Sequence, residues 1–101
     1  MQRGATEQYK FNFNNANVAD MTAIRVAFVQ EAIKVIKDDT VLTVDTETNS
    51  VTASLSQEET LLFEDKKLLH IQLKFKDVNE NVETTKIFTD SVYPILDEEV
   101  I

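Results

Sequence analysis

The sequence LHIQLKFK, residues 69–76, alternates strictly between apolar and polar side chains. Leucine, isoleucine and phenylalanine occupy the odd positions, and histidine, glutamine and lysine occupy the even ones. Successive side chains of a β-strand point to opposite faces, so this alternation predicts a strand with one face on a core and one in water. We expect the strand to span residues 66–77. Such half-buried strands are typical of antiparallel sheets, which favours an all-β domain over an α/β enzyme.

Three further runs have the spacing or composition of strands. Aromatic and polar residues alternate over residues 9–13, and apolar and hydroxyl residues alternate over residues 51–55. Residues 84–95 are rich in the β-branched and aromatic types that strands favour. Their alternation slips near Asp90, which predicts a bulge or bend there. Pro94 cannot donate to a ladder, so we expect that end of the strand to be an edge or an exit.

Turns must be made here almost without glycine or proline, because the chain has one of each. Asn, Asp and Ser side chains can bond to the local backbone and so take over this role. Clusters of these residues separate the periodic runs, at residues 14–17, 37–39, 47–50, 64–65 and 79–81.

Residues 20–37 allow two interpretations. Met21, Ile24, Phe28, Ala32 and Ile36 lie near one helical stripe, which a preceding aspartate could cap. The segment is nevertheless crowded with β-branched residues, whose stiff side chains lower helix propensity. We therefore favour a hairpin over a helix that begins after Asp20. Its strands would span residues 22–29 and 32–37, with a turn at Gln30 and Glu31.

A short helix is predicted directly after the 51–55 strand. Ser56 and Glu59 have the spacing of a capping box, in which the serine hydroxyl accepts from the N3 amide and the glutamate reaches back to the N-cap amide. We expect a helical turn or two over residues 57–62. One of the apolar side chains that follow, Leu61, Leu62 or Phe63, should pack under the sheet.

Length and composition place limits on the class of protein. The chain has 101 residues, so we expect a single β-sandwich domain over 1–101, with an acidic and loosely held tail at 96–101. It contains no cysteine, so disulfides and thiolate zinc sites are excluded. The first six residues are polar without an apolar run behind them, and we expect no signal peptide. No apolar segment approaches the ~20 residues of a membrane span.

The charge is concentrated in one part of the chain. There are 18 acidic and 10 basic residues, a net charge of −8, and residues 38–65 hold eight acids and no base. This balance argues against binding to nucleic acid or to an anionic membrane. The segment could be a solvated surface that discourages self-association, a docking face for a basic partner, or a mimic of DNA charge. The candidate acidic docking surface comprises Asp45, Glu47, Glu58, Glu59, Glu64 and Asp65.

No pattern in the sequence indicates a catalytic, cofactor-binding or metal site, and we expect no small-molecule substrate. His70 is the only histidine and is interpreted as a half-exposed strand residue. Residues 45–49 place oxygen ligands at alternate positions, but the glycine and glutamate that a calcium loop needs are replaced by Ser50 and Ser56. We interpret that stretch as a turn. The eight aromatic residues are interpreted as core, because a stacking platform would place exposed rings beside basic residues.

The order of these segments resembles a family of small proteins encoded among the tail and baseplate genes of phages and prophages of Gram-positive bacteria. The resemblance covers most of the chain and rests on several weak motifs. These lie at residues 3–6, 9–13, 20, 24–30, 51–60, 71–73, 95–96 and 100–101, and the match is strongest over VTASLSQEET, residues 51–60. The family has glycine-containing turns after the Gln30 position and between its last two strands. Here these turns read Glu31-Ala32 and Asn79-Glu80-Asn81.

The resemblance implies an immunoglobulin-like antiparallel β-sandwich of about six or seven strands. It implies a non-enzymatic virion structural or assembly protein of the tail or baseplate. Such a protein would reside in the host cytoplasm during assembly and then in the virion. Its partners would be other phage structural proteins or further copies of itself, without nucleic acid, membrane or cofactor. The alternative is an acidic prophage-encoded inhibitor or binding module that docks on a basic host protein.

Overall fold

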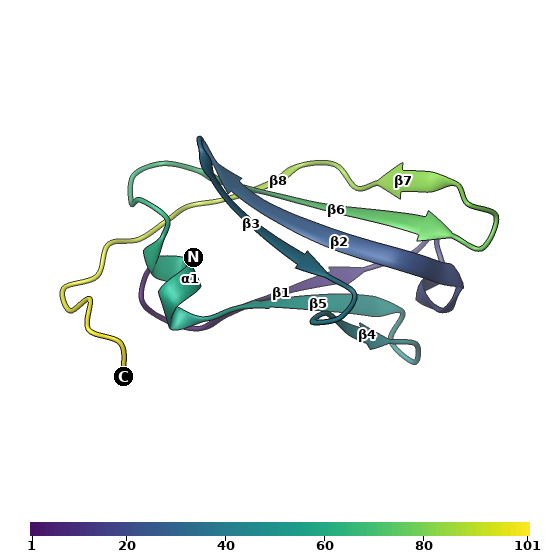
Figure 1. Ribbon diagram of the computed structural model, residues 1–101, viewed down its shortest axis with the longest axis horizontal. Coiled ribbons are helices and arrows are strands. Elements are labelled where there is room, and N and C mark those ends of the chain that lie inside the picture. Colours follow the sequence, from purple (N-terminus) through teal and green to yellow (C-terminus); the bar gives the residue numbers. More distant parts are fainter.

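The computed structural model describes residues 1–101, and it contains two antiparallel sheets packed face to face (Figure 1). The strands are β1 (Glu7–Asn12), β2 (Met21–Gln30), β3 (Ile33–Asp38), β4 (Thr43–Asp45), β5 (Ser50–Leu55), β6 (Leu69–Asp77), β7 (Val82–Thr84) and β8 (Phe88–Asp90). The smaller sheet has the order β1-β5-β4, and the larger has the order β3-β2-β6-β7, with β8 also paired to β6. The all-β sandwich with one short helix is therefore confirmed, with eight strands in place of six or seven.

The alternating stretch that predicts the fold forms the centre of the larger sheet. Leu69, Ile71 and Leu73 are buried in β6, and their polar neighbours point to the outer face. In β2, Val26 pairs with Leu73 and Phe28 pairs with Ile71, so two strands with the same alternation bury their apolar faces together. These side chains pack against the inner face of the smaller sheet and form one core cluster.

The hairpin interpretation of residues 20–37 is confirmed, because β2 and β3 pair from Arg25–Asp38 to Gln30–Ile33. The turn lies at Glu31 and Ala32, one residue later than predicted. Glu31 has φ 53°, a left-handed conformation that glycine adopts more easily. The segment before β2 forms a short 3-10 turn, η1 (Val18–Asp20).

The prediction that a strand begins at residue 66 is wrong by three residues. Lys66 has φ 68°, which no strand residue adopts, and β6 begins at Leu69. The preceding loop is held by Gln30, whose Nε2 donates to the backbone oxygens of Glu64 (2.8 Å) and Lys67 (3.1 Å). These bonds fix the loop backbone away from the ladder geometry.

The single strand predicted over residues 84–95 is also wrong, since β7 and β8 are separate short strands on the same edge of β6. Residues 85–87 interrupt them. At the break, the Leu73 N–H donates to Thr85 Oγ1 (3.1 Å), so a side-chain hydroxyl takes a role that a backbone carbonyl plays in a regular ladder. β8 ends at Asp90, where the slip was predicted, and Pro94 lies outside every strand as expected.

The helix α1 (Gln57–Leu61) begins with the predicted capping box, in which Ser56 Oγ accepts from the Glu59 N–H and Glu59 Oε1 accepts from the Ser56 N–H. Of the three apolar residues predicted to pack under the sheet, Phe63 is fully buried, whereas Leu62 is 55% exposed. No helix of the structure is long and apolar enough to cross a membrane.

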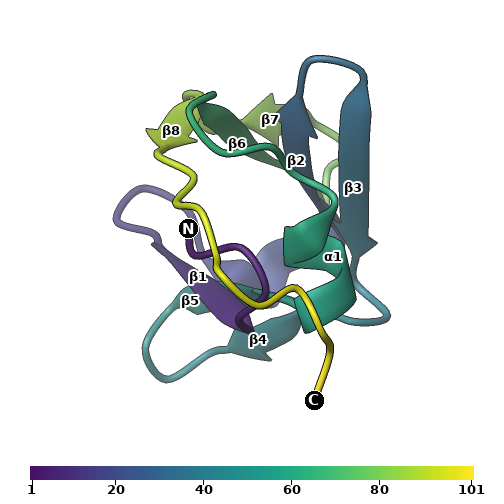
Figure 2. The same ribbon diagram turned by 90° about the vertical axis from the view of Figure 1, so that its left-hand side faces the viewer.

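The N-terminal segment packs beside α1. The only glycine, Gly4, has φ 79°, and its N–H donates to Thr60 Oγ1 (2.9 Å). Arg3 Nε donates to the backbone oxygen of Phe63 (2.6 Å). Residues 96–101 have no regular secondary structure, and Leu96 is fully exposed. Together these segments cover one end of the sandwich, which Figure 2 views directly.

Candidate interaction site

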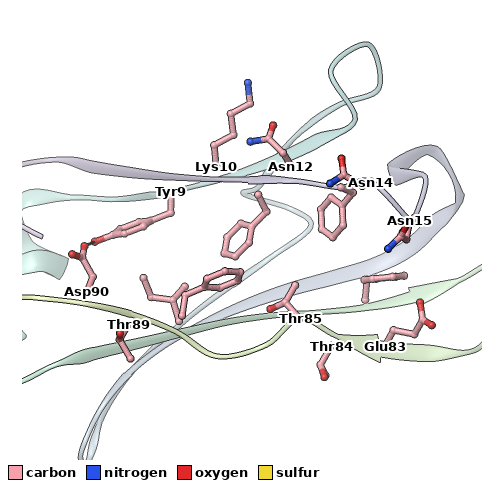
Figure 3. Close-up of a pocket in the computed structure, with 16 residues that line it drawn as sticks. Tyr9, Lys10, Asn12, Asn14, Asn15, Glu83, Thr84, Thr85, Thr89 and Asp90 are labelled. Atoms are coloured by element: carbon pink, nitrogen blue, oxygen red, sulfur yellow. Dashed lines mark hydrogen bonds between the residues drawn. The ribbon is translucent and has the colours of Figure 1, made fainter.

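A groove runs along one side of the sandwich, between β1 of the smaller sheet and β7 and β8 of the larger one (Figure 3). We call this groove the seam. Its volume is about 870 Å³. It exists because both bordering elements are edge strands, so no strand bridges the two sheets on this side.

Aromatic rings line the seam in pairs across the two sheets. The ring centroids of Phe11 and Phe88 lie 5.8 Å apart and those of Phe13 and Phe75 lie 6.1 Å apart, both edge to face. Edge-to-face contacts at this distance are favourable for aromatic rings. Phe88 is nevertheless 38% exposed, which is unusual for a ring on the inner side of a sheet. Part of the apolar inner surface is therefore exposed to solvent at the seam, whereas it is covered elsewhere in the sandwich.

Asp90 closes one end of the seam. Its Oδ2 accepts from the Tyr9 hydroxyl (2.8 Å), which joins β8 to β1, and from the amino group of Met1 (2.9 Å). Burial, followed by this hydrogen bond and the charge of Asp90, raises the pKa of Tyr9 far above its ordinary value. Tyr9 is therefore a neutral hydrogen-bond donor at every physiological pH.

The opposite end of the seam is bordered by polar side chains, including Asn14, Asn15 and Glu83 (Figure 3). Beside β8, Lys86 Nζ lies 5.2 Å from the centroid of the Phe88 ring. The two rims are backbone edges, each with a strand neighbour on one side only. Such edges can pair with an added strand, and the aromatic lining can receive its apolar side chains. The geometry thus suits an extended segment of polypeptide.

The six acids of the predicted docking surface lie in two separate groups. Asp45 and Glu47 belong to the β4–β5 hairpin, whereas the other four lie on α1 and in the loop after it. Figure 1 places the β4–β5 turn and α1 toward opposite ends of the long axis. A single partner surface would have to be elongated to contact both groups.

Three of these acids already have partners within the chain. Glu59 pairs with Lys37 (2.6 Å) and Glu64 pairs with Lys67 (2.6 Å). Asp45 Oδ1 accepts from the backbone N–H groups of Glu47 (3.0 Å) and Thr48 (3.3 Å). Hydrogen bonding to Thr48 holds the pKa of Asp45 below its ordinary value. These three carboxylates therefore stabilise local structure as well as contributing charge.

The stretch 45–49 and His70 were the other candidate site residues considered from the sequence. The stretch 45–49, considered above as a calcium loop, forms the β4–β5 turn, with Asn49 at φ 53°. Asn49 Nδ2 donates to the backbone oxygens of Phe13 (2.9 Å) and Ala16 (2.7 Å). His70 is exposed on the outer face of β6, opposite the core.

Sequence reasoning missed the seam. The core interpretation of the aromatic residues is correct for most of them, but Phe88 is partly exposed and Tyr93 is 56% exposed. The sequence signal for the seam is that Phe88 and Asp90, two residues apart in a strand, lie on the same face. A carboxylate on a core-facing position needs a hydrogen-bond partner. The partner, Tyr9, comes from the other sheet, and no local pattern indicates which strands meet there.

Comparison of the chain with known protein families, with curated proteins and with solved structures finds no match.

Proposed function

We propose that this protein is a non-enzymatic structural or assembly component of a phage or prophage virion, associated with the tail or baseplate. It acts through protein–protein contacts at the seam. The virion part of the proposal rests on the family resemblance in the sequence. The contact mode rests on one observation, the aromatic groove between the edge strands β1 and β7–β8.

Binding at the seam would proceed by strand addition. A partner supplies an extended segment whose backbone pairs with one of the two open edges. Alternate side chains of that segment enter the groove and cover Phe88 and its aromatic neighbours. Main-chain hydrogen bonds supply a general affinity, and the fit of apolar side chains supplies specificity.

The alternative, an acidic inhibitor that docks on a basic host protein, has weaker support. It needs a contiguous and unpaired acidic face, whereas the candidate acids lie in two groups and two of them are paired with lysines. The seam, in contrast, is lined by aromatic rings from both sheets.

The test compares two exposed aromatic residues, one inside the seam and one outside it. Phe88 lines the seam, and Tyr93 does not. Wild type, Phe88→Asp and Tyr93→Asp would serve as baits in lysates of a lysogenic bacterium, before and after prophage induction, with captured proteins identified by mass spectrometry. Thermal unfolding of each bait checks that it is folded.

We expect wild type and Tyr93→Asp to capture the same virion structural proteins after induction only, and Phe88→Asp to lose them. Capture of a host nucleic-acid enzyme in both lysates would replace the proposal by the inhibitor alternative. Equal capture by all three baits would show that the contact lies outside the seam.

A further inference from the structure

The outer face of the five-stranded sheet has no covering layer, and its side chains form regular rows across the strands. The register places Lys34, Val29, His70 and Thr89 in one row. Ile36, Ala27 and Gln72 form the next, followed by Asp38, Arg25, Lys74 and Thr84, and then by Ala23, Lys76 and Val82. We call this surface the basic face.

The basic face carries a local charge opposite to that of the whole protein. Arg25, Lys34, Lys74 and Lys76 are exposed, and none of them forms an ion pair within the chain. The only acid in these rows is Asp38, beside Arg25. Four free cations therefore lie on one side of a chain whose net charge is −8.

The centre of the basic face is apolar. Ala27 and Val29 are half-buried, and Ile36 beside them is 36% exposed. These apolar residues are bordered by Lys34 on one side and by Arg25 and Lys74 on the other. An apolar strip with a charged rim is the usual composition of a protein–protein contact.

A complementary surface lies on the other side of the sandwich, along the edge strand β4. Asp45 ends β4, Glu47 lies in the turn after it, and Asp39 lies in the loop that leads from β3 to β4. All three are exposed and form no ion pairs within the chain. Val41, in the loop before β4, is 61% exposed, and Val44, which pairs with the buried Val51 on the inner face of β4, is 41% exposed. We call this surface the acidic β4 edge. In Figure 2 the five-stranded sheet forms the top and right of the molecule, and β4 lies at the bottom.

We propose that the basic face binds the acidic β4 edge of a second copy of this chain, so that copies assemble head to tail. The proposal is independent of the seam. Each surface presents apolar residues with charges predominantly of one sign, and the two signs are opposite, which favours a fixed docking orientation. Because the surfaces lie on opposite sides of one molecule, the contact is heterologous and continues into a ring or a filament.

Solution conditions decide whether such a contact forms. Copies with a net charge of −8 repel one another at long range, but screening at about 0.15 M salt limits that repulsion to about 8 Å. Paired charges in contact are closer than this and still attract. At about 1 M salt the screening length falls to about 3 Å, and the pairs weaken as well.

The experiment is sedimentation velocity at high protein concentration, with charge reversals on each surface. Lys74→Glu/Lys76→Glu alters the basic face, and Asp39→Lys/Glu47→Lys alters the β4 edge while keeping the Asp45 turn. Lys66→Glu is the control, since this lysine forms no ion pair and lies off the basic face. Circular dichroism verifies the fold of each variant.

We expect wild type and the control to form species larger than a dimer, which weaken at about 1 M salt. Each surface variant alone should associate at least about tenfold more weakly than wild type, because reversal converts attraction into repulsion. Mixing the two surface variants should restore association, because the intact β4 edge of one variant meets the intact basic face of the other and the two reversed surfaces are again opposite in charge.

Three results would overturn the proposal. Wild type could remain monomeric at millimolar concentration. The control could lose association as completely as the surface variants. The basic face could instead bind a DNA duplex while the protein stays monomeric, in which case its ligand would be a polyanion and not a second copy.

Discussion

The α1 end and the seam are two boundaries of the same core, and they are closed by different means. At the α1 end, Gln30 and Thr60 are fully buried and hydrogen-bonded, and Phe63 is fully buried as well. At the seam, aromatic rings from both sheets face a groove of about 870 Å³, and Asp90 is hydrogen-bonded across it to Tyr9. The α1 end is closed by hydrogen bonds from several segments, whereas the seam is lined with apolar side chains and is open to solvent.

The difference separates a stabilising boundary from one suited to binding. Buried polar side chains with all their hydrogen bonds made specify one arrangement and leave nothing for a partner. Partly exposed rings contribute less to folding and keep free energy of burial available for association. Substitutions at the α1 end should therefore affect stability, and substitutions at the seam should affect binding.

The largest contrast is expected between two phenylalanines. Phe63 is fully buried, so Phe63→Ala should lower the free energy of unfolding by about 3–5 kcal/mol. Phe88→Ala should cost only about 1 kcal/mol, because the ring is 38% exposed in the native state. Urea unfolding monitored by circular dichroism measures both. Equal losses would mean that the seam is as much a part of the core as the α1 end.

The next contrast is between two glutamines on neighbouring strands. Gln30 is buried and makes three hydrogen bonds to the loop after α1, so Gln30→Ala should cost about 2–3 kcal/mol by leaving backbone groups unpaired. Gln72 on the outer face makes one, to Thr85 O (2.9 Å), and Gln72→Ala should cost less than about 1 kcal/mol. Hydrogen exchange should localise the Gln30→Ala effect to the loop over residues 64–67. Exchange unchanged in that loop would count against Gln30 as the residue that holds it.

Much of the α1 end could be predicted from the sequence, because its determinants are local. The capping box requires only the spacing of Ser56 and Glu59, and the hairpin before it follows from alternation and β-branching. What could not be predicted is the role of Gln30, which contacts a loop 34 residues away in the chain. A polar residue at the end of a strand gives no local sign that it will be buried.

The seam and the basic face could not be predicted because both depend on strand order. Periodicity assigns Lys34 and Lys74 to the outer faces of their strands, but only the register shows that they border one apolar strip. The break at residues 85–87 similarly follows from one hydroxyl, Thr85 Oγ1, which bonds to β6. Local propensity therefore predicted strand structure in this region correctly, but it did not predict that β7 and β8 would be separate strands.

Acid should weaken the capping box of α1. Burial acts to raise the pKa of Glu59, but hydrogen bonds from Lys37 and from the Ser56 backbone outweigh it and hold this pKa below its ordinary value. A carboxyl with a lowered native pKa stabilises the fold above the unfolded value of 4.5, and the effect is lost as pH falls through the native pKa. Glu59→Gln should therefore cost stability at neutral pH and little at about pH 3. Urea midpoints at both pH values test this, and a pH-independent difference would contradict it.

The smallest expected effects are gains in stability, one at each end of the sandwich. Glu31 in the β2–β3 turn and Glu80 in the β6–β7 turn have φ 53° and 64°, and both occupy turns where the resembling family has glycine. Glycine adopts this conformation without steric cost, so Glu80→Gly should stabilise the protein by up to about 1 kcal/mol. Glu31→Gly should gain less, since it also removes the exposed ion pair between Glu31 and Lys67 (3.2 Å).

Replacement of Glu31 or Glu80 by alanine is the control, because it removes the charge and keeps the strain. If alanine and glycine gave the same change, charge would be responsible. A larger gain with glycine than with alanine in both turns would show that both turns carry backbone strain.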